Sequence, residues 1–312
     1  EQGPNIFRRE AAQTVIAVAL SAGLIAFQPG VIVSFGSLFV LFVIVTKNTQ
    51  VGIRLIILYA PFFLFPLELY RFFFQMAEIL VWLTFVGWGI QRGIAWARNW
   101  QVVAASYRQR VQINLSALDW GLVAWVIIAA ISILWADYRG EAVRDFRELF
   151  LQPFLFYVLL RSSKRTPDLT RQWILTFIAA GTLVAVASLL TRSIITAEDG
   201  AMRLAGIYGS PNNLALYLLR CIPFALSGAL FLRHRNWRLL LGTVSLVMIA
   251  VVLLTQSVSA YLISLPVIVV VLLYARFGRR ALLRVLKLDH ERSRTDESES
   301  ATKVACPRPS TR

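Results

Sequence analysis

The sequence predicts an all-α protein, a polytopic transmembrane helical bundle with about ten spans. Hydrophobic residues make up 57% of the 312 residues and the mean hydropathy is +0.64, so the chain is more apolar than an ordinary soluble domain. Apolar stretches long enough to cross about 30 Å of hydrocarbon recur along it. Basic residues alternate with these stretches, so the net charge of +15 indicates a membrane surface and excludes nucleic acid as the partner.

The predicted spans follow one another through mostly short connections, which predicts one helical domain over residues 1–288. No cleavage site of small residues separates the first two apolar runs, so we expect the first to stay as an anchor. A polar stretch at 289–312 predicts a disordered cytoplasmic tail. The spans centre on residues 14–28, 31–46, 53–67, 76–90, 118–135, 149–161, 173–191, 212–232, 238–256 and 260–275.

The orientation follows from the 32 Lys and Arg residues. If the N-terminus is cytoplasmic, most of them fall on the inner side, as the positive-inside rule requires. We therefore expect a multi-pass membrane protein with both termini in the cytoplasm. The inner loop 91–117 mixes Trp and Tyr with Arg, which predicts a helix lying among the lipid headgroups.

Arginines in two outer loops go against this inward bias and are candidates for binding an anion. In the loop 135–149, Arg144 and Arg147 lie three residues apart, on one face of a helix. Neighbouring Asp145 and Glu148 make local ion pairs an equal alternative. The second loop, 192–211, contains Arg203.

The segment after Arg203 predicts the start of a helix on the outer side of the membrane. Ser210 suits the N-cap and Pro211 the first helical position, ahead of an apolar run. Free amides and the positive end of the helix dipole would suit a phosphate, and Gly206 would let the backbone approach it. The alternative is a well-capped span with no ligand. The candidate binding residues here are Gly209, Ser210, Asn212 and Asn213.

Arg220 lies well inside the span that follows, where a charge costs roughly 2.5–3.5 kcal/mol on insertion scales. It therefore needs an anionic partner. Three interpretations stay open: an ion pair with Glu78 of another span, a role in binding substrate, and solvation in a cavity.

Three segments resemble the O-antigen ligase/polymerase family of bacterial membrane glycosyltransferases, over roughly residues 15–285. The most specific is RLAGIYGSPNNLALYL at 203–218. The segment FRELFLQPFLFYVLLR at 146–161 resembles the family's arginine-led span, and LTQSVSAYLISLP at 254–266 resembles a later helix. Two positions depart from the family pattern, since Val258 replaces a basic residue and Ser259 replaces a glycine.

The resemblance implies that the protein lies in the bacterial cytoplasmic (inner) membrane. There it would transfer a glycan from undecaprenyl diphosphate to an acceptor glycan or lipid at the outer face of that membrane, with no metal or cofactor. The resemblance also implies a catalytic role for Arg203, which would offset charge on the departing diphosphate. Arg144, Arg147 and Arg220 are the further candidates for binding the substrate. The family continues beyond the later helix with a large outer loop, so the chain resembles a truncated member. Truncation, a frameshift and genuine shortening stay open as the cause, and so does activity.

Two other functions remain as alternatives. In a transporter of an anionic solute, Arg220 and Glu78 would line the path, although the two halves of the chain show no clear internal repeat. In a non-catalytic scaffold fragment, the donor site would be kept and a second chain would provide the acceptor site.

Overall fold

The computed structural model describes residues 4–69, 72–98, 116–163, 166–191, 193–196 and 202–278. These residues form the helices α1–α4 and α6–α11, a further helix at 258–278 and four short strands, and the chain divides into two compact units, residues 1–180 and 181–312. The protein is a multi-span helical membrane protein by the length and hydropathy of its helices. Five helical stretches are long and apolar enough to cross a membrane: Ala117–Trp135, Pro167–Thr191, Pro211–Phe231, Arg235–Leu254 and Ala260–Gly278.

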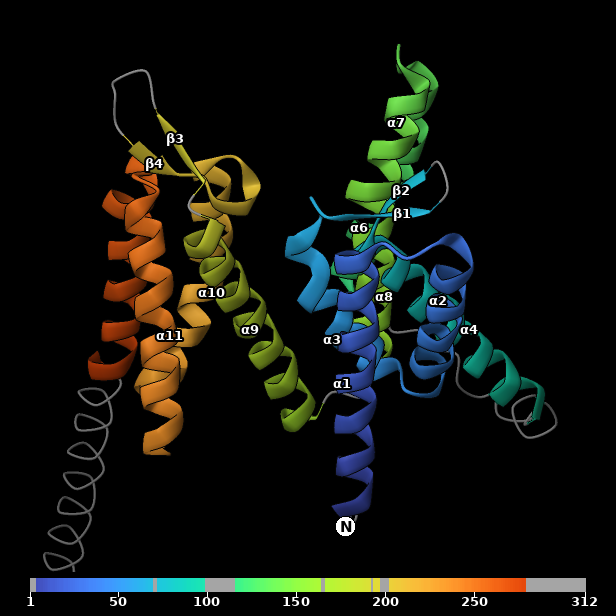
Figure 1. Cartoon of the computed structure of the whole chain (residues 1–312), viewed down its shortest axis with the longest axis horizontal. Helices are drawn as coiled ribbons and strands as arrows, with labels where there is room; N and C mark the ends of the chain where they lie inside the picture. The colour runs from blue at the N-terminus through green and yellow to red at the C-terminus, as the bar shows by residue number, and fades with distance from the viewer. Residues whose placement is uncertain are drawn as a thin grey trace, which may run out of the picture. The chain divides into compact units, whose positions relative to one another are not determined.

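The first unit begins with the helices α1 (Pro4–Phe27), α2 (Val31–Lys47), α3 (Thr49–Tyr59) and α4 (Met76–Arg98) (Figure 1). Asn48 separates α2 from α3 because it serves both as the C-cap of α2 and as the N-cap of α3. Its side chain accepts a hydrogen bond from the backbone N–H of Gln50 at 3.1 Å. A polar cap of this kind ends one helix and starts the next.

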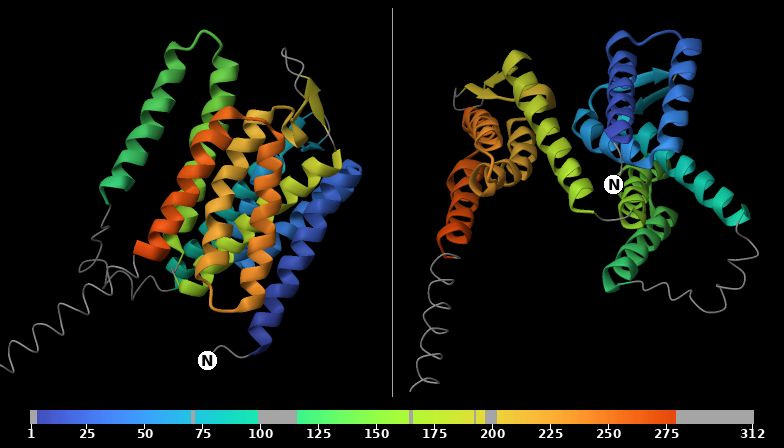
Figure 2. Two further views of the ribbon diagram at one scale, coloured as in Figure 1. Left: turned by 90° about the vertical axis from the view of Figure 1, so that its left-hand side faces the viewer. Right: turned by 90° about the horizontal axis from the view of Figure 1, so that it is seen from below.

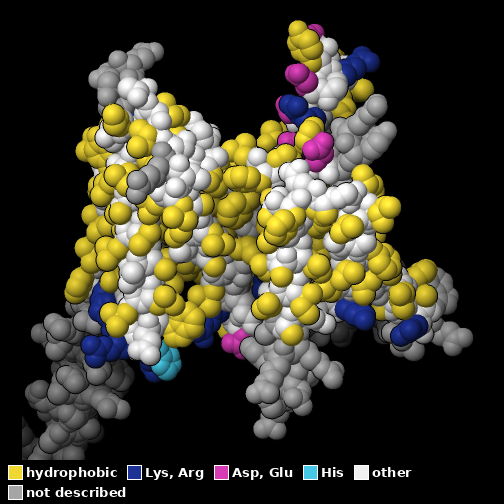
Figure 3. All heavy atoms as spheres, in the orientation of Figure 1, with side chains coloured by type: hydrophobic (Ala, Val, Ile, Leu, Met, Phe, Trp, Pro, Cys, Tyr) yellow, Lys and Arg dark blue, Asp and Glu magenta, His cyan; other side chains and the backbone are white. Residues whose placement is uncertain are grey.

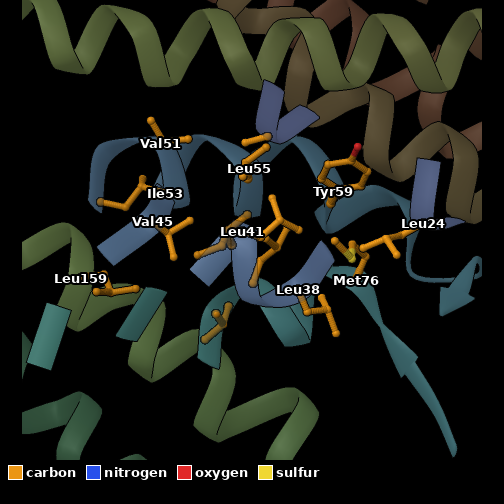
Figure 4. Packing of buried hydrophobic residues seen from close by; sticks show 14 of the residues in the cluster. Leu24, Leu38, Leu41, Val45, Val51, Ile53, Leu55, Tyr59, Met76 and Leu159 are labelled. Carbon is orange, nitrogen blue, oxygen red and sulfur yellow. The ribbon is translucent and has the colours of Figure 1, made fainter. Parts of the chain in front are cut away.

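Apolar side chains from α2, α3 and α4 form the core of this unit. Leu41, Ile53, Leu55 and Leu80 are completely buried, and several of the cluster's side chains converge in Figure 4. Gly87 allows a close approach of α4 to α2, because a Cβ atom there would lie 3.0 Å from Cα of Thr46. Small residues permit such contacts between helices in membranes.

The predicted span 53–67 is wrong beyond Tyr59. After α3, the 3-10 turn η1 (Ala60–Phe62) leads to the hairpin of β1 (Pro66–Leu69) and β2 (Phe72–Gln75). Pro61 and Pro66 lack the N–H group that would continue a helix. The aromatic run that follows favours a strand, and Leu67 faces Phe74 across the hairpin.

The rest of the first unit contains α6 (Ala117–Ser132), the 3-10 turn η2 (Ile133–Trp135), α7 (Arg139–Asp145), the π-helical turn η3 (Phe146–Leu151) and α8 (Gln152–Ser162). The chain reverses between α6 and α7, as Figure 2 shows. Trp125 of α6 packs on Phe150 of η3, with ring centroids 4.6 Å apart. The predicted span 149–161 is therefore the second part of a longer helical stretch that begins at Arg139.

Asp119 ties the start of α6 to the end of α8. It forms a capping box with Ser116, whose backbone N–H donates to Oδ2 of Asp119 at 2.7 Å. Arg161 of α8 pairs with the same carboxylate at 3.4 Å, and the hydroxyl of Tyr157 donates to its other oxygen. Sequence analysis overlooked this acidic residue because it lies at the edge of a predicted span.

Replacing Asp119 with Ala should lower the thermal unfolding temperature of the purified protein, because the helix start and Arg161 both lose their partner. The matched control is Asp137→Ala, since Asp137 is exposed. Equal unfolding temperatures for the two variants would show that the Asp119 cluster contributes nothing to stability.

Helix α9 (Pro167–Thr191) crosses from the first unit into the second. The second unit adds the hairpin of β3 (Ile194–Thr196) and β4 (Met202–Leu204), then α10 (Pro211–Phe231) and α11 (Arg235–Leu254). The last described helix covers residues 258–278 and starts with the π-helical turn η5 (Ala260–Ser264). Both hairpins were missed by sequence analysis, because its search was for long apolar stretches.

The surface agrees with a protein that faces lipid. Hydrophobic side chains cover the flanks of the helices in Figure 3, and Lys and Arg gather near helix ends. Examples are Ile32 of α2 and Leu190 of α9, which are 88% and 77% exposed. The polar tail 289–312 and most of the predicted interfacial loop 91–117 lie outside the described residues.

Candidate functional site

Arg203 sits on the second strand of the β3–β4 hairpin, opposite Ile195. The backbone N–H groups of Ala205 and Gly206 both donate to the carbonyl oxygen of Ser193, at 2.9 and 3.3 Å. These bonds close the base of the hairpin and fix the point at which the chain turns toward α10.

Two glycines make the turn from the hairpin into α10. Gly206 has φ +57° and Gly209 has φ +63°, both in the left-handed region that glycine adopts without strain. A Cβ atom on Gly206 would overlap the side chain of Ser188, whereas nothing lies within 4 Å of the Cβ position at Gly209. The close approach predicted for Gly206 is therefore to the protein itself.

Helix α10 begins as predicted. Ser210 is its N-cap and Pro211 its first residue. The Ser210 side chain makes no capping hydrogen bond. Asn212 and Asn213, in the first turn, are both exposed.

The guanidinium of Arg203 joins the start of α10 to the end of α11. Its Nε–H donates to the backbone carbonyl of Thr255 at 3.1 Å, and Nη2 donates to Oδ1 of Asn212 at 3.1 Å. Arginine has five N–H donors. Within the part of the chain that the structure describes, the remaining donors of Arg203 have no protein partner.

The carbonyl of Thr255 is accessible because the helix breaks there. Helix α11 ends at Leu254, and Gln256 follows with φ +51°. The backbone N–H of Ser257 donates to Oγ1 of Thr255, and a new helix starts at residue 258. A carbonyl at the end of a helix has no partner within the helix, so a side chain can bind it.

A pocket of about 490 Å³ opens beside this arrangement. One part of its wall is polar and the other is apolar and exposed, with Val258 58%, Leu262 62% and Ile263 65% exposed. Such a pocket suits a ligand with a polar head and an apolar tail. The polar residues that line it are Arg203, Asn212, Ser257 and Ser259.

Tyr208 belongs to the turn between the β3–β4 hairpin and α10, and it is unsuited to act as a base. Its ring packs against that of Tyr217, with centroids 6.1 Å apart. Burial raises the pKa of the Tyr208 phenol well above its usual range. The phenol is therefore neutral throughout the physiological pH range.

The other predicted arginines of the site are not among the described residues that line this pocket. Arg220 belongs to the same unit but lies about 12 Å along α10 from Asn212, is exposed, and is not among the lining residues. Arg144 and Arg147 belong to the first unit. Arg144 forms an exposed ion pair with Asp145 at 3.7 Å, the local alternative that the sequence left open.

Glu78 has a different partner from the predicted Arg220. Nε of Arg147 lies 2.9 Å from Oε1 of Glu78, and Nη2 of Arg147 lies 3.6 Å from Glu148. Glu78 is 3% exposed and sits in the first turn of α4, where the helix dipole favours a negative charge. Arg147 is thus paired with two carboxylates, those of Glu78 and Glu148.

Sequence analysis missed Thr255, Ser257 and Ser259 as members of this site. The segment 254–266 was noted for its resemblance, but its residues were not connected with Arg203. The only available signal was the helix break itself, where polar residues follow an apolar run.

Comparison with known proteins identifies no family for this chain, because no protein-family model, curated protein or solved structure matches it.

Replacing Arg147 with Ala should lower the free energy of unfolding by about 2 kcal/mol, between the values typical of exposed and buried ion pairs. The physical reason is that buried Glu78 would lose its partner. The matched control is Arg144→Ala, which removes an exposed arginine close by and should change the unfolding free energy by less than about 0.5 kcal/mol. Chemical denaturation in detergent measures both, and a similar loss in both variants would contradict the prediction.

Proposed function

We propose that this protein is similar in function to the O-antigen ligase/polymerase family. It binds an undecaprenyl-diphosphate-linked glycan at the outer face of the cytoplasmic membrane, and Arg203 contacts the diphosphate. One observation carries the proposal. The two segments 203–218 and 254–266, which resemble the family separately, meet at one pocket through the hydrogen bond from Arg203 to Thr255.

The chemistry of the pocket supports a lipid-linked diphosphate. The free N–H donors of Arg203 suit phosphate oxygens, which guanidinium groups bind through paired hydrogen bonds. Asn212 and Ser259 add neutral polar groups. The exposed apolar side chains of Val258, Leu262 and Ile263 suit a polyprenyl chain that continues into the bilayer.

In the transfer reaction, an acceptor hydroxyl would form the new bond to the anomeric carbon of the glycan. The bond from that carbon to the diphosphate oxygen would break, undecaprenyl diphosphate would leave with the electron pair, and the hydroxyl proton would pass to water. The role proposed for Arg203 is to offset negative charge on the leaving diphosphate. Val258 and Ser259 stand where the family has a basic residue and a glycine. Among the described residues that line this pocket, Arg203 is therefore the one cation.

The finer expectations from the sequence belong to this proposal as well. It includes about ten spans, both termini in the cytoplasm, and an acceptor that is a glycan or a lipid. With this orientation, the β3–β4 hairpin and the start of α10 face outward, where a lipid-linked glycan awaits transfer.

Arg203→Ala should weaken binding of undecaprenyl diphosphate by about tenfold or more, the loss expected when charge-assisted hydrogen bonds are removed. Binding can be measured by native mass spectrometry of the purified full chain. The matched control is Arg238→Ala, since Arg238 lies on α11 and donates to the carbonyl of Ala229, away from the pocket. Unchanged affinity in Arg203→Ala would refute the proposal.

A further inference from the structure

A second pocket lies in the first unit, between α1, α3 and the first part of α9. It has a volume of about 310 Å³ and all its lining residues belong to this unit. Most of its wall is apolar, formed by Val18 of α1, Leu55 and Leu58 of α3, and Leu175 and Ala179 of α9. One charged residue, Arg54 of α3, completes the wall.

The guanidinium of Arg54 is only partly satisfied by the protein. Its Nε–H donates to the carbonyl of Gln50 at 3.2 Å, and Nη1 donates to Oε1 of Gln172 at 3.2 Å. Nη2 is buried, and among the described residues it has no hydrogen-bond partner. A buried donor on a charged group is costly to leave unpaired. Arg54, which lines the pocket, therefore carries a positive charge that the protein satisfies only in part.

The other polar residues of the pocket need no ligand. The hydroxyl of Thr14 donates to the carbonyl of Glu10 at 2.8 Å, and that of Thr176 donates to the carbonyl of Gln172 at 2.8 Å. Glu10 attracts Arg54 electrostatically but forms no ion pair with it among the residues that the structure describes. Among the described residues that line this pocket, Arg54 is therefore the one that still needs a partner, and a single anionic group would supply it.

We propose that this pocket binds one anionic phospholipid of the membrane, with its phosphate on Arg54 and part of one acyl chain along Val18, Leu58 and Ala179. Two observations favour a lipid over a free anion as the ligand of this pocket. The apolar wall suits a hydrocarbon chain and offers nothing to a free hydrated anion, and the charge of Arg54 complements a phosphate.

The position of the pocket agrees with this ligand. Arg54 lies about 8 Å along α3 from its first residue, Thr49. Gln172 lies in the second turn of α9, and Thr14 is the first residue of the predicted span 14–28 of α1. A phosphate at this depth, close to the predicted cytoplasmic ends of the three helices, matches the headgroup level of the inner leaflet, where arginines recognise anionic lipids.

Native mass spectrometry of the purified full chain tests the site with phosphatidylglycerol as the probe and phosphatidylcholine as the neutral comparison. Arg54→Gln should weaken phosphatidylglycerol binding by about tenfold, the loss expected for a charge-assisted hydrogen bond. Ala179→Phe should cause a similar loss, because it fills the apolar part of the pocket and leaves Arg54 in place. The matched control, Arg238→Gln, removes an arginine of the second unit and should bind as the unaltered chain does.

Two outcomes would overturn the proposal. One is phosphatidylglycerol binding that Arg54→Gln and Ala179→Phe leave unchanged. The other is displacement of phosphatidylglycerol by inorganic phosphate, which would indicate a site for a free anion. If Arg54→Gln fails to fold, Arg54→Lys replaces it as a variant that keeps the positive charge. Loss of phosphatidylglycerol binding in Ala179→Phe then decides alone whether the pocket binds the lipid. Because Arg203 is intact in all these variants, undecaprenyl diphosphate binding should stay unchanged.

Discussion

The hydrogen bonds of Arg203 are the constraint on which the second unit depends. One guanidinium holds the carbonyl of Thr255 at the end of α11 and the side chain of Asn212 at the start of α10. The β3–β4 hairpin and the left-handed turns at Gly206 and Gly209 bring it there. Each of these features lies in a different part of the sequence, and together they form the pocket proposed to hold a diphosphate.

Charged side chains near helix ends play the same part in the first unit. Arg147 binds Glu78, which joins η3 to α4, and Asp119 binds Arg161, which joins α6 to α8. Charges inside an apolar protein are costly unless they are paired. The pairing explains why these residues are tolerated, and it separates them from Arg203 and Arg54, which keep donors for a ligand.

The sequence predicted the helical architecture well because apolar spans are long and their signal is strong. The starts of α2 and α10, and the whole of α6 with η2, agree closely with prediction. The hairpin after α3 could not be predicted in this way, because Pro61 and Pro66 interrupt a run that is otherwise apolar enough to be a span. Short strands carry too few residues for a hydropathy pattern to reveal them.

The candidate site was predicted in part. Arg203, Ser210 and Asn212 were identified from local sequence, since helix starts have a local signature. Thr255 and Ser257 were not, because the hydrogen bond from Arg203 to Thr255 joins positions about fifty residues apart, and pairing over that distance is fixed by tertiary packing. The pairing of Glu78 with Arg147 was not predicted for the same reason.

Protection of Arg203 from an arginine-specific reagent such as phenylglyoxal tests the central claim most directly. Peptide mass spectrometry would measure the modification of Arg203 and Arg238 in the full chain. Undecaprenyl diphosphate should protect Arg203 and leave Arg238 reactive, while undecaprenol, which lacks the phosphates, should protect neither. Equal modification of Arg203 with and without undecaprenyl diphosphate would contradict the account.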